Sequence, residues 1–124
     1  MLTISNTTKA KLPRLAFSVM ADAILAKKYE LSLVFVSAAK MKKLNLIHRD
    51  IDKTTDILSF PLSKNEGEMY ICLTETKKEA KNFDRAYENF LGFLFIHGCV
   101  HLKGFDHSST MERIEAQFRK RFNI

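Results

Sequence analysis

The sequence predicts an α+β fold, an α/β sandwich in which several helices pack against a small mixed four-stranded sheet. Short apolar runs with strand character lie among longer segments of helical periodicity, and the helical segments outweigh the runs. No repeat, low-complexity tract or Pro/Gly/Ser-rich linker divides the 124 residues, which include four Gly and two Pro. We therefore expect one domain over residues 1–124.

The first third of the chain is expected to form an edge strand, a helix and a central strand. Residues 2–4 supply the edge strand. Pro13 suits the first turn of a helix, where its missing N–H costs nothing. Residues 31–36 are apolar on nearly both faces, which is typical of a central strand covered on both sides. The helix is predicted from apolar side chains at helical spacing: Leu12, Leu15, Ala16, Val19, Met20 and Ala23.

Two further strands are expected in the middle of the chain. Residues 57–60 precede Pro61, and residues 69–73 follow turn residues that end in Gly67. Because both runs are short and a turn separates them, we expect them to pair as neighbours.

Capping-box patterns predict the remaining helices. Thr76 with Glu79 opens a helical stretch that breaks near residues 82–84 and resumes toward Lys103. Ser109 with Glu112 repeats the pattern and opens a last helix. Its apolar face, at steps of three, four and four, consists of Met111, Ile114, Phe118 and Phe122.

The composition indicates a chain of the cytoplasm. Cys72 and Cys99 are too few for a disulfide framework and are expected to pack as small apolar residues, so a reducing compartment is the natural reading. The apolar run at residues 90–96 is too short to span a bilayer, which needs about 20 residues. The first residues lack a charged segment followed by an apolar stretch, so we expect no signal peptide.

The charge balance gives a first indication of partners. Twenty Lys and Arg against fourteen Asp and Glu leave a net charge of +6, with a pI near 9.4. Such a balance suits a polyanion such as nucleic acid, and it also suits a solubilising surface. The basic residues are spread along the chain without interleaved aromatic residues, so charge alone does not decide between these readings.

Three of the four histidines lie within eleven residues and predict a metal site on a helix and the turn after it. His97 and His101 stand four apart on the face that Phe90 and Leu94 begin, so both imidazoles can reach one ion. Gly104 is a good helix stop, after which His107 can supply a third ligand. Three nitrogen donors suit one zinc ion, and a fourth position left open for water is typical of a catalytic site.

The spacing of these histidines matches that of metzincin peptidases except at one position. Gly98 stands where those enzymes carry the glutamate that takes a proton from the metal's water. Because glycine cannot act as a base, a peptidase is disfavoured.

Two segments together resemble the YbeY endoribonucleases, metal-dependent bacterial rRNA maturation factors. The first, residues 97–107, is similar to the family signature H-G-x-L-H-L-x-G-Y-D-H, with Val100 and Phe105 as mild departures. The second, residues 44–61, is similar to L-N-x-x-x-R-x-x-D-x-x-T-D-V-L-S-F-P at the same spacing. Residues 67–72 match the family's G-D-I-V-I-S strand more weakly. In length and motif order the resemblance covers nearly the whole chain.

The resemblance implies a zinc-dependent endoribonuclease that cleaves single-stranded RNA. It implies that His97, His101 and His107 hold the zinc, and that His97 and Arg49 serve catalysis, the arginine facing the metal across a cleft. A metal and a guanidinium can stabilise the charge of a phosphodiester from two sides. The implied role is maturation of the 3′ end of small-subunit rRNA and ribosome quality control, with rRNA and the ribosome as partners, and neither DNA nor a membrane.

Several other residues near these motifs each allow two interpretations from the sequence. Asp106 either orients a ligand imidazole or helps to begin the last helix. Asp56 and Ser59 either line the cleft or serve turn and strand structure. His48 is expected at the surface or on a phosphate rather than on the metal.

Two alternative functions remain open. One is another three-histidine zinc hydrolase, including a metzincin-like peptidase with an unusual base. The other is a non-enzymatic RNA-binding module of ribosome assembly whose zinc is structural.

Overall fold

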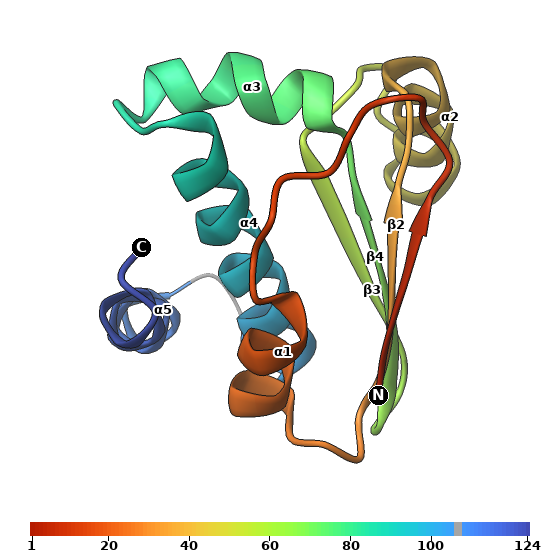
Figure 1. The fold of residues 1–124 in the computed structure, drawn as a ribbon. Helices are drawn as coiled ribbons and strands as arrows, with labels where there is room; N and C mark the ends of the chain where they lie inside the picture. The colour runs from red at the N-terminus through yellow and green to blue at the C-terminus, as the bar shows by residue number, and fades with distance from the viewer. Residues whose placement is uncertain (106–107) are drawn as a thin grey trace.

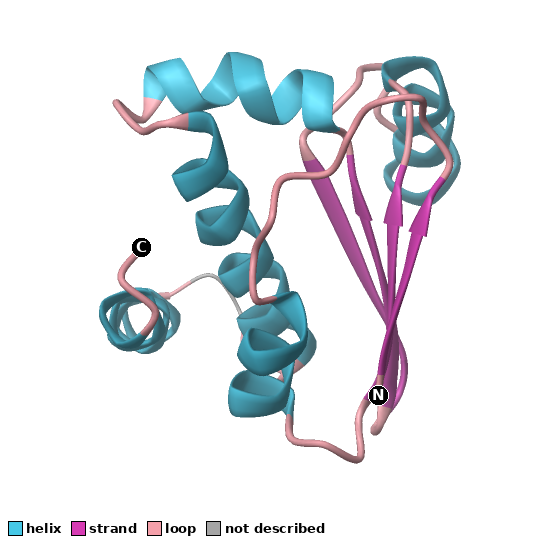
Figure 2. Ribbon diagram, in the orientation of Figure 1, coloured by secondary structure: helices cyan, strands magenta, loops and turns pink. Residues whose placement is uncertain are grey.

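The computed structural model describes residues 1–105 and 108–124. These residues form five helices and four strands (Figures 1 and 2). In chain order they are β1 (Leu2–Asn6), α1 (Phe17–Leu25), β2 (Glu30–Phe35), α2 (Ala38–Arg49), β3 (Ile57–Ser63), β4 (Glu66–Ile71), α3 (Leu73–Asn82), α4 (Tyr87–Leu102) and α5 (Ser109–Arg121).

The four strands form one mixed sheet in the order β1-β2-β4-β3. The strands β1, β2 and β4 run parallel, and β3 pairs antiparallel with β4 in a register that sets Ser59 opposite Met69. The expected edge strand, the expected central strand and the expected pairing of the two middle strands are all confirmed. Pro61 is accommodated because β3 is an edge strand, where a missing N–H breaks no ladder.

Helices cover both faces of this sheet. On one face, α1 and α4 pack on buried side chains of the central strands such as Leu33 and Met69. On the other face, Met41 and Leu44 of α2 pack with Leu58 of β3. Figure 1 shows α2 on the far side of the sheet from α1 and α4, with α5 beyond α4. The predicted α+β sandwich is therefore confirmed, with α4 lying between the sheet and α5.

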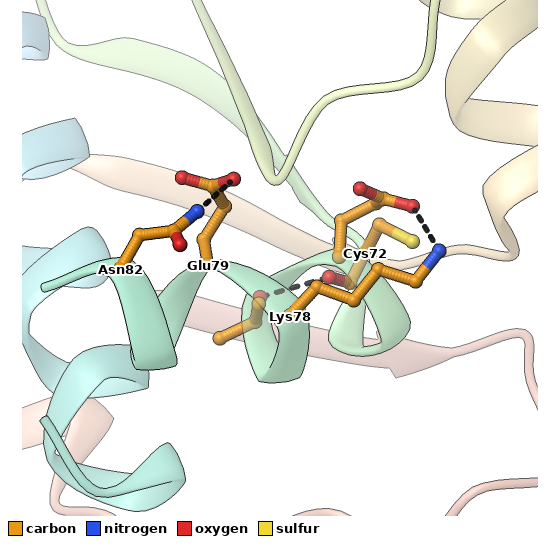
Figure 3. Close-up of polar contacts among 6 residues, drawn as sticks. Cys72, Lys78, Glu79 and Asn82 are labelled. Carbon is orange, nitrogen blue, oxygen red and sulfur yellow. Dashed lines mark hydrogen bonds and ion pairs between the residues drawn. The ribbon is translucent and has the colours of Figure 1, made fainter. Parts of the chain in front are cut away.

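Two predicted helix starts are wrong. The helix expected from Pro13 begins at Phe17, and its Val19, expected on the buried face, is 59% exposed. The buried face is set instead by Phe17, Met20 and Ile24. The helix expected to open at Thr76 begins at Leu73. Thr76 is buried inside it, and its hydroxyl donates to the Cys72 carbonyl at 2.8 Å, one of the bonds drawn in Figure 3.

The last two helices follow the prediction closely. The break falls at the end of α3, where Asp84 has a φ of 52°, and α4 resumes at Tyr87. The cap of α5 is Ser108 rather than Ser109, and its hydroxyl accepts from the Met111 N–H at 3.2 Å. Because the cap differs from the predicted one by a single residue, the predicted apolar face of α5 still packs against the core.

The helix α2 was not predicted. Ser37 caps it by accepting from the Lys40 N–H at 3.2 Å. Of its apolar side chains only Met41 and Leu44 are buried, while Leu46 and Ile47 are exposed, so its sequence carries little helical periodicity.

Both cysteines are buried free thiols, as expected. Within the described residues, the helices are too short or too polar to cross a membrane.

Candidate active site

The helix α4 presents two histidines to a cleft. Its Phe90 and Leu94 are buried, and His97 and His101 continue the same face one and two turns later, where they are half-buried. Both imidazoles line a pocket of about 480 Å³ between α4, β3 and the end of α2. The residues that line it are Arg49, residues 55–60, His97, Gly98 and His101.

Gly98 brings α4 into close contact with the sheet. A Cβ atom at this position would lie 2.6 Å from Cε of Met69, 2.8 Å from Oγ of Ser59 and 2.9 Å from Cδ1 of Ile57. These distances are well inside normal van der Waals contact. The position that holds the catalytic glutamate in metzincins is therefore packed against β3 and β4 here, and it lacks the space for a side chain.

A carboxylate on α5 holds one of the histidines. Nδ1 of His97 lies 2.8 Å from Oε1 of Glu115, which is 4% exposed. With the carboxylate of Glu115 as the acceptor, the ring donates from Nδ1, and in the neutral imidazole this leaves Nε2 as the acceptor nitrogen. The hydrogen bond to Glu115 raises the pKa of His97, against burial, which lowers it, and the charges of Glu115, Asp56 and Glu112 add to the rise.

Glu115 was not among the residues predicted for the site. It stands four residues after Met111 and three before Phe118, so it occupies a buried position of the amphipathic helix. A charged residue in the apolar stripe of a helix is costly to bury without a partner. That pattern, read beside an unassigned histidine cluster, is the signal that could have found it.

The pocket's guanidinium comes from the last residue of α2. Leu44 is buried against the sheet, and the buried Asn45 donates from Nδ2 to the Lys53 carbonyl at 2.9 Å, which ties down the loop after the helix. Asp50 ends the helix with a φ of 58°. Arg49 is thereby held at the mouth of the pocket, exposed to solvent.

Asp56 and Ser59 both line the same pocket. The backbone of Asp56 is fixed where its carbonyl accepts from the Cys72 N–H at 2.9 Å. Burial raises the pKa of the Asp56 carboxyl, and the charge of Glu79 adds to this, while hydrogen bonds to the carboxylate lower it. Both residues thus border the pocket, and a role of either in catalysis stays a prediction. His48 lies away from the histidines, exposed, with its ring centroid 4.5 Å from that of Phe60.

The family model described as Endoribonuclease YbeY matches residues 2–123. The chain belongs to the YbeY family. The Endoribonuclease YbeY of Sulfurimonas denitrificans is 33% identical over 100% of this chain and 93% of the relative. That of Campylobacter jejuni strain RM1221 is 38% identical over 77% of this chain and 76% of the relative. A protein of Thermotoga maritima solved in solution has a TM-score of 0.70 at 26% identity, covering 98% of this chain and 89% of that one.

The YbeY signatures coincide with the residues that shape the pocket. In the first signature, the paired histidines line it and the glycine between them provides the close contact with β3. In the second signature, the leucine and asparagine anchor α2 and its loop, and the arginine four residues after the asparagine reaches the pocket. Two segments that are 36 residues apart in the chain thus contribute to one cleft.

Two of the predicted site residues, Asp106 and His107, lie outside the described residues. The turn that precedes them is described: Gly104 has a φ of 105°, a backbone conformation that favours glycine. Within residues 1–105 and 108–124, no group of three or more His, Cys, Asp or Glu side chains is placed to hold a metal ion. The three-histidine site therefore stays a prediction.

The described donors nevertheless fit a zinc ion. His97 and His101 supply two imidazoles on one helix face. The carboxylate of Glu115 on Nδ1 of His97 is the outer partner that metal-binding histidines usually have, because it fixes the tautomer and directs the other nitrogen to the metal. This arrangement was visible in the structure but not in the histidine spacing.

Proposed function

We propose that this chain is a metal-dependent endoribonuclease that cleaves single-stranded RNA. The observation that carries the proposal is the pocket of about 480 Å³ in which the imidazoles of His97 and His101 and the guanidinium of Arg49 come together. Membership of the YbeY family supports the choice of RNA as the substrate. The packed position of Gly98 argues against a peptidase of the metzincin type, since no base can stand there.

Three histidines would hold one zinc ion: His97, His101 and His107, the last of which lies outside the described residues. When bound, zinc supplies a Lewis acid that polarises a phosphoryl oxygen and lowers the pKa of water. The Glu115 carboxylate would support this set by accepting from Nδ1 of His97, which leaves Nε2 as the nitrogen that would bind the ion.

Arg49 would bind the scissile phosphate. A guanidinium presents a planar fork of N–H donors that matches two phosphate oxygens, and it stays charged at every relevant pH. Its position at the mouth of the pocket leaves it free to meet the substrate as the strand enters. Donors aimed at the phosphate stabilise the charge that concentrates there as the bond breaks.

The net charge of +6 suits this substrate. Cationic side chains neutralise phosphates and release counterions, which attracts RNA from a distance. We further propose that the substrate in the cell is the 3′ region of small-subunit rRNA, that the chain acts in the cytoplasm with the ribosome as partner, and that it takes part in ribosome quality control. Support for these finer roles comes from the family resemblance.

The test is cleavage of a labelled single-stranded RNA by the zinc-loaded chain, with and without a chelator. We expect cleavage that the chelator abolishes. Arg49→Ala should lose cleavage while its zinc content and unfolding midpoint match the wild type, whereas His101→Ala should lose both cleavage and zinc. Undiminished cleavage by Arg49→Ala would contradict the role of the arginine, and proteolysis without RNA cleavage would overturn the proposed function.

A further inference from the structure

A second pocket lies beside the cleft, on the other side of His97. It has a volume of about 440 Å³, within the range of about 300–1,000 Å³ typical of sites for small ligands. Its walls come from the end of α3, one face of α4 and the start of α5. His97, Asp56 and Ile57 line both pockets, so the second pocket adjoins the cleft.

One wall of the second pocket is aromatic. The rings of Phe83, Phe90 and Phe93 pack against one another, with centroids 5.0 Å apart for Phe83 and Phe90, 5.4 Å for Phe90 and Phe93, and 5.7 Å for Phe83 and Phe93. Phe90 is fully buried. Guanidinium groups of Arg85 and Arg119 lie over the Phe93 ring, at 4.6 and 5.0 Å. Phe83 is 51% exposed, so among these three rings it has the surface left for a further planar group.

The backbone fixes Phe83 in this position. It ends α3, and its N–H bonds to the carbonyls of Glu79 and Ala80, both at 3.3 Å. The next residue, Asp84, turns the chain with a φ of 52°, so that α4 can follow. An exposed phenylalanine held rigidly at a helix end loses little conformational entropy when a ligand stacks on it.

Four carboxyl groups also line the second pocket, beside the apolar side chains of Ile57, Leu94 and Met111. Glu79 lines the pocket and accepts from Nδ2 of Asn82 at 3.2 Å, as Figure 3 shows, and Glu112 accepts from Arg119 at 3.1 Å. Asp56 and Glu115 line the same space. Four carboxyl groups repel a phosphate, so the RNA backbone is excluded. A neutral planar ring with N–H donors meets both the aromatic wall and the carboxylate acceptors.

We propose that the second pocket is a nucleobase subsite of the endoribonuclease. One base next to the cleaved bond turns out of the strand and stacks on Phe83, and its exocyclic amino group donates to Glu79 or Glu112. Adenine, cytosine and guanine carry such a group, whereas the one donor on the pairing edge of uracil, N3–H, lies between two carbonyl oxygens that the carboxylates repel. The subsite therefore selects amino-bearing bases over uracil. This inference rests on the proposed function, since it assigns the strand to the adjoining cleft.

The first test measures binding rather than cleavage. A fluorescent single-stranded RNA with 2′-O-methyl riboses is titrated with the full chain, and anisotropy gives the Kd. Because a base that stacks on an aromatic side chain strengthens binding, we expect Phe83→Ala to bind this RNA about tenfold more weakly than the wild type. The matched control is Leu62→Ala, since Leu62 is also a large apolar residue, is 54% exposed and lies outside this pocket. Equal affinities for Phe83→Ala and the control would overturn the subsite.

The second test measures which bases the chain prefers beside the cleaved bond. Single-stranded RNA with a randomised segment is cleaved, and the ends are sequenced. We expect depletion of uracil at one position beside the cut. Glu79→Gln should weaken the depletion of uracil. The control, Glu88→Gln, removes an exposed carboxylate on α4 that does not line the second pocket, and it should leave the depletion unchanged. Cleavage with no base bias would overturn the subsite and leave the proposed function standing. If the wild type cleaves no RNA, the proposed function fails, and the anisotropy result alone decides the subsite.

Discussion

Nδ1 of His97 lies 2.8 Å from Oε1 of Glu115 and so joins α4 to α5 across 18 residues of chain. The contact lies at the boundary between the cleft and the second pocket. A buried carboxylate that accepts from one imidazole nitrogen fixes the direction of the other nitrogen. The orientation of the candidate metal ligand therefore depends on a residue outside the histidine signature.

Glu115→Gln tests this dependence. The amide keeps the size and an acceptor oxygen but removes the charge that stabilises the donating tautomer. Loss of such an outer partner lowers metal affinity by about 10–100-fold, and we expect zinc affinity to fall within that range. Competition with a chromophoric chelator gives the affinity. Glu88→Gln is the control, and equal zinc affinity for the wild type and Glu115→Gln would show that the carboxylate has no such role.

Gly98→Ala tests the close contact between α4 and the sheet. The added methyl group would press against Met69, Ser59 and Ile57, each at under 3.0 Å. Overpacking of this kind costs about 1–3 kcal/mol, so the free energy of unfolding should fall by that amount. Urea unfolding followed by circular dichroism measures it. A variant as stable as the wild type would mean that the helix can move away from β3 without loss.

The salt dependence of RNA binding tests the electrostatic role of Arg49. For a single strand, the logarithm of the binding constant falls with the logarithm of salt concentration by about 0.7 for each phosphate neutralised. Arg49→Gln should therefore bind RNA with a slope shallower by about 0.7. Anisotropy titrations at several salt concentrations give the slopes. Parallel lines for the two proteins would place the guanidinium away from the phosphates.

Tyr70 provides a pH test that is independent of any metal. Its hydroxyl donates to Oε2 of Glu68 at 2.6 Å, and this bond, with burial and the Glu68 charge adding to it, raises the pKa of Tyr70 to about 12. Since the unfolded tyrosine ionises near 10.0, the stabilisation is present below that pH and is lost between about 10 and 12.

An absorbance titration at the tyrosinate band resolves this transition by comparison with Tyr70→Phe. Glu68→Gln should move the transition toward lower pH, because the charge and the strong acceptor are both lost. Ionisation of Tyr70 near 10 in the wild type would contradict the hydrogen bond.

Much of the fold could be predicted because local patterns agree with tertiary burial. In α4, Phe90, Leu94, His97 and His101 follow a single face, and Gly104 ends the segment with its positive φ. The parallel strand β2 alternates fully and partly buried residues, as expected of a strand between two layers.

The predictions that were wrong or absent have physical causes. Pro13 favours a helix start, but Leu12 and Leu15 pack only partly buried against the core, and the helix begins at Phe17, the first buried side chain of this segment. The helix α2 buries too few apolar residues to show periodicity. The sequence marks Glu115 as a charge in the buried stripe of α5, but its pairing with His97 depends on how α5 packs on α4.

The most direct test of the proposed metal centre is an anomalous difference map from crystals of the zinc-loaded chain, recorded at the zinc absorption edge. We predict one peak per chain in the pocket lined by Arg49, at about 2.0–2.1 Å from an imidazole nitrogen of both His97 and His101. A map from fully loaded protein with no peak between these two rings, or with its peak at another place on the chain, would contradict the account.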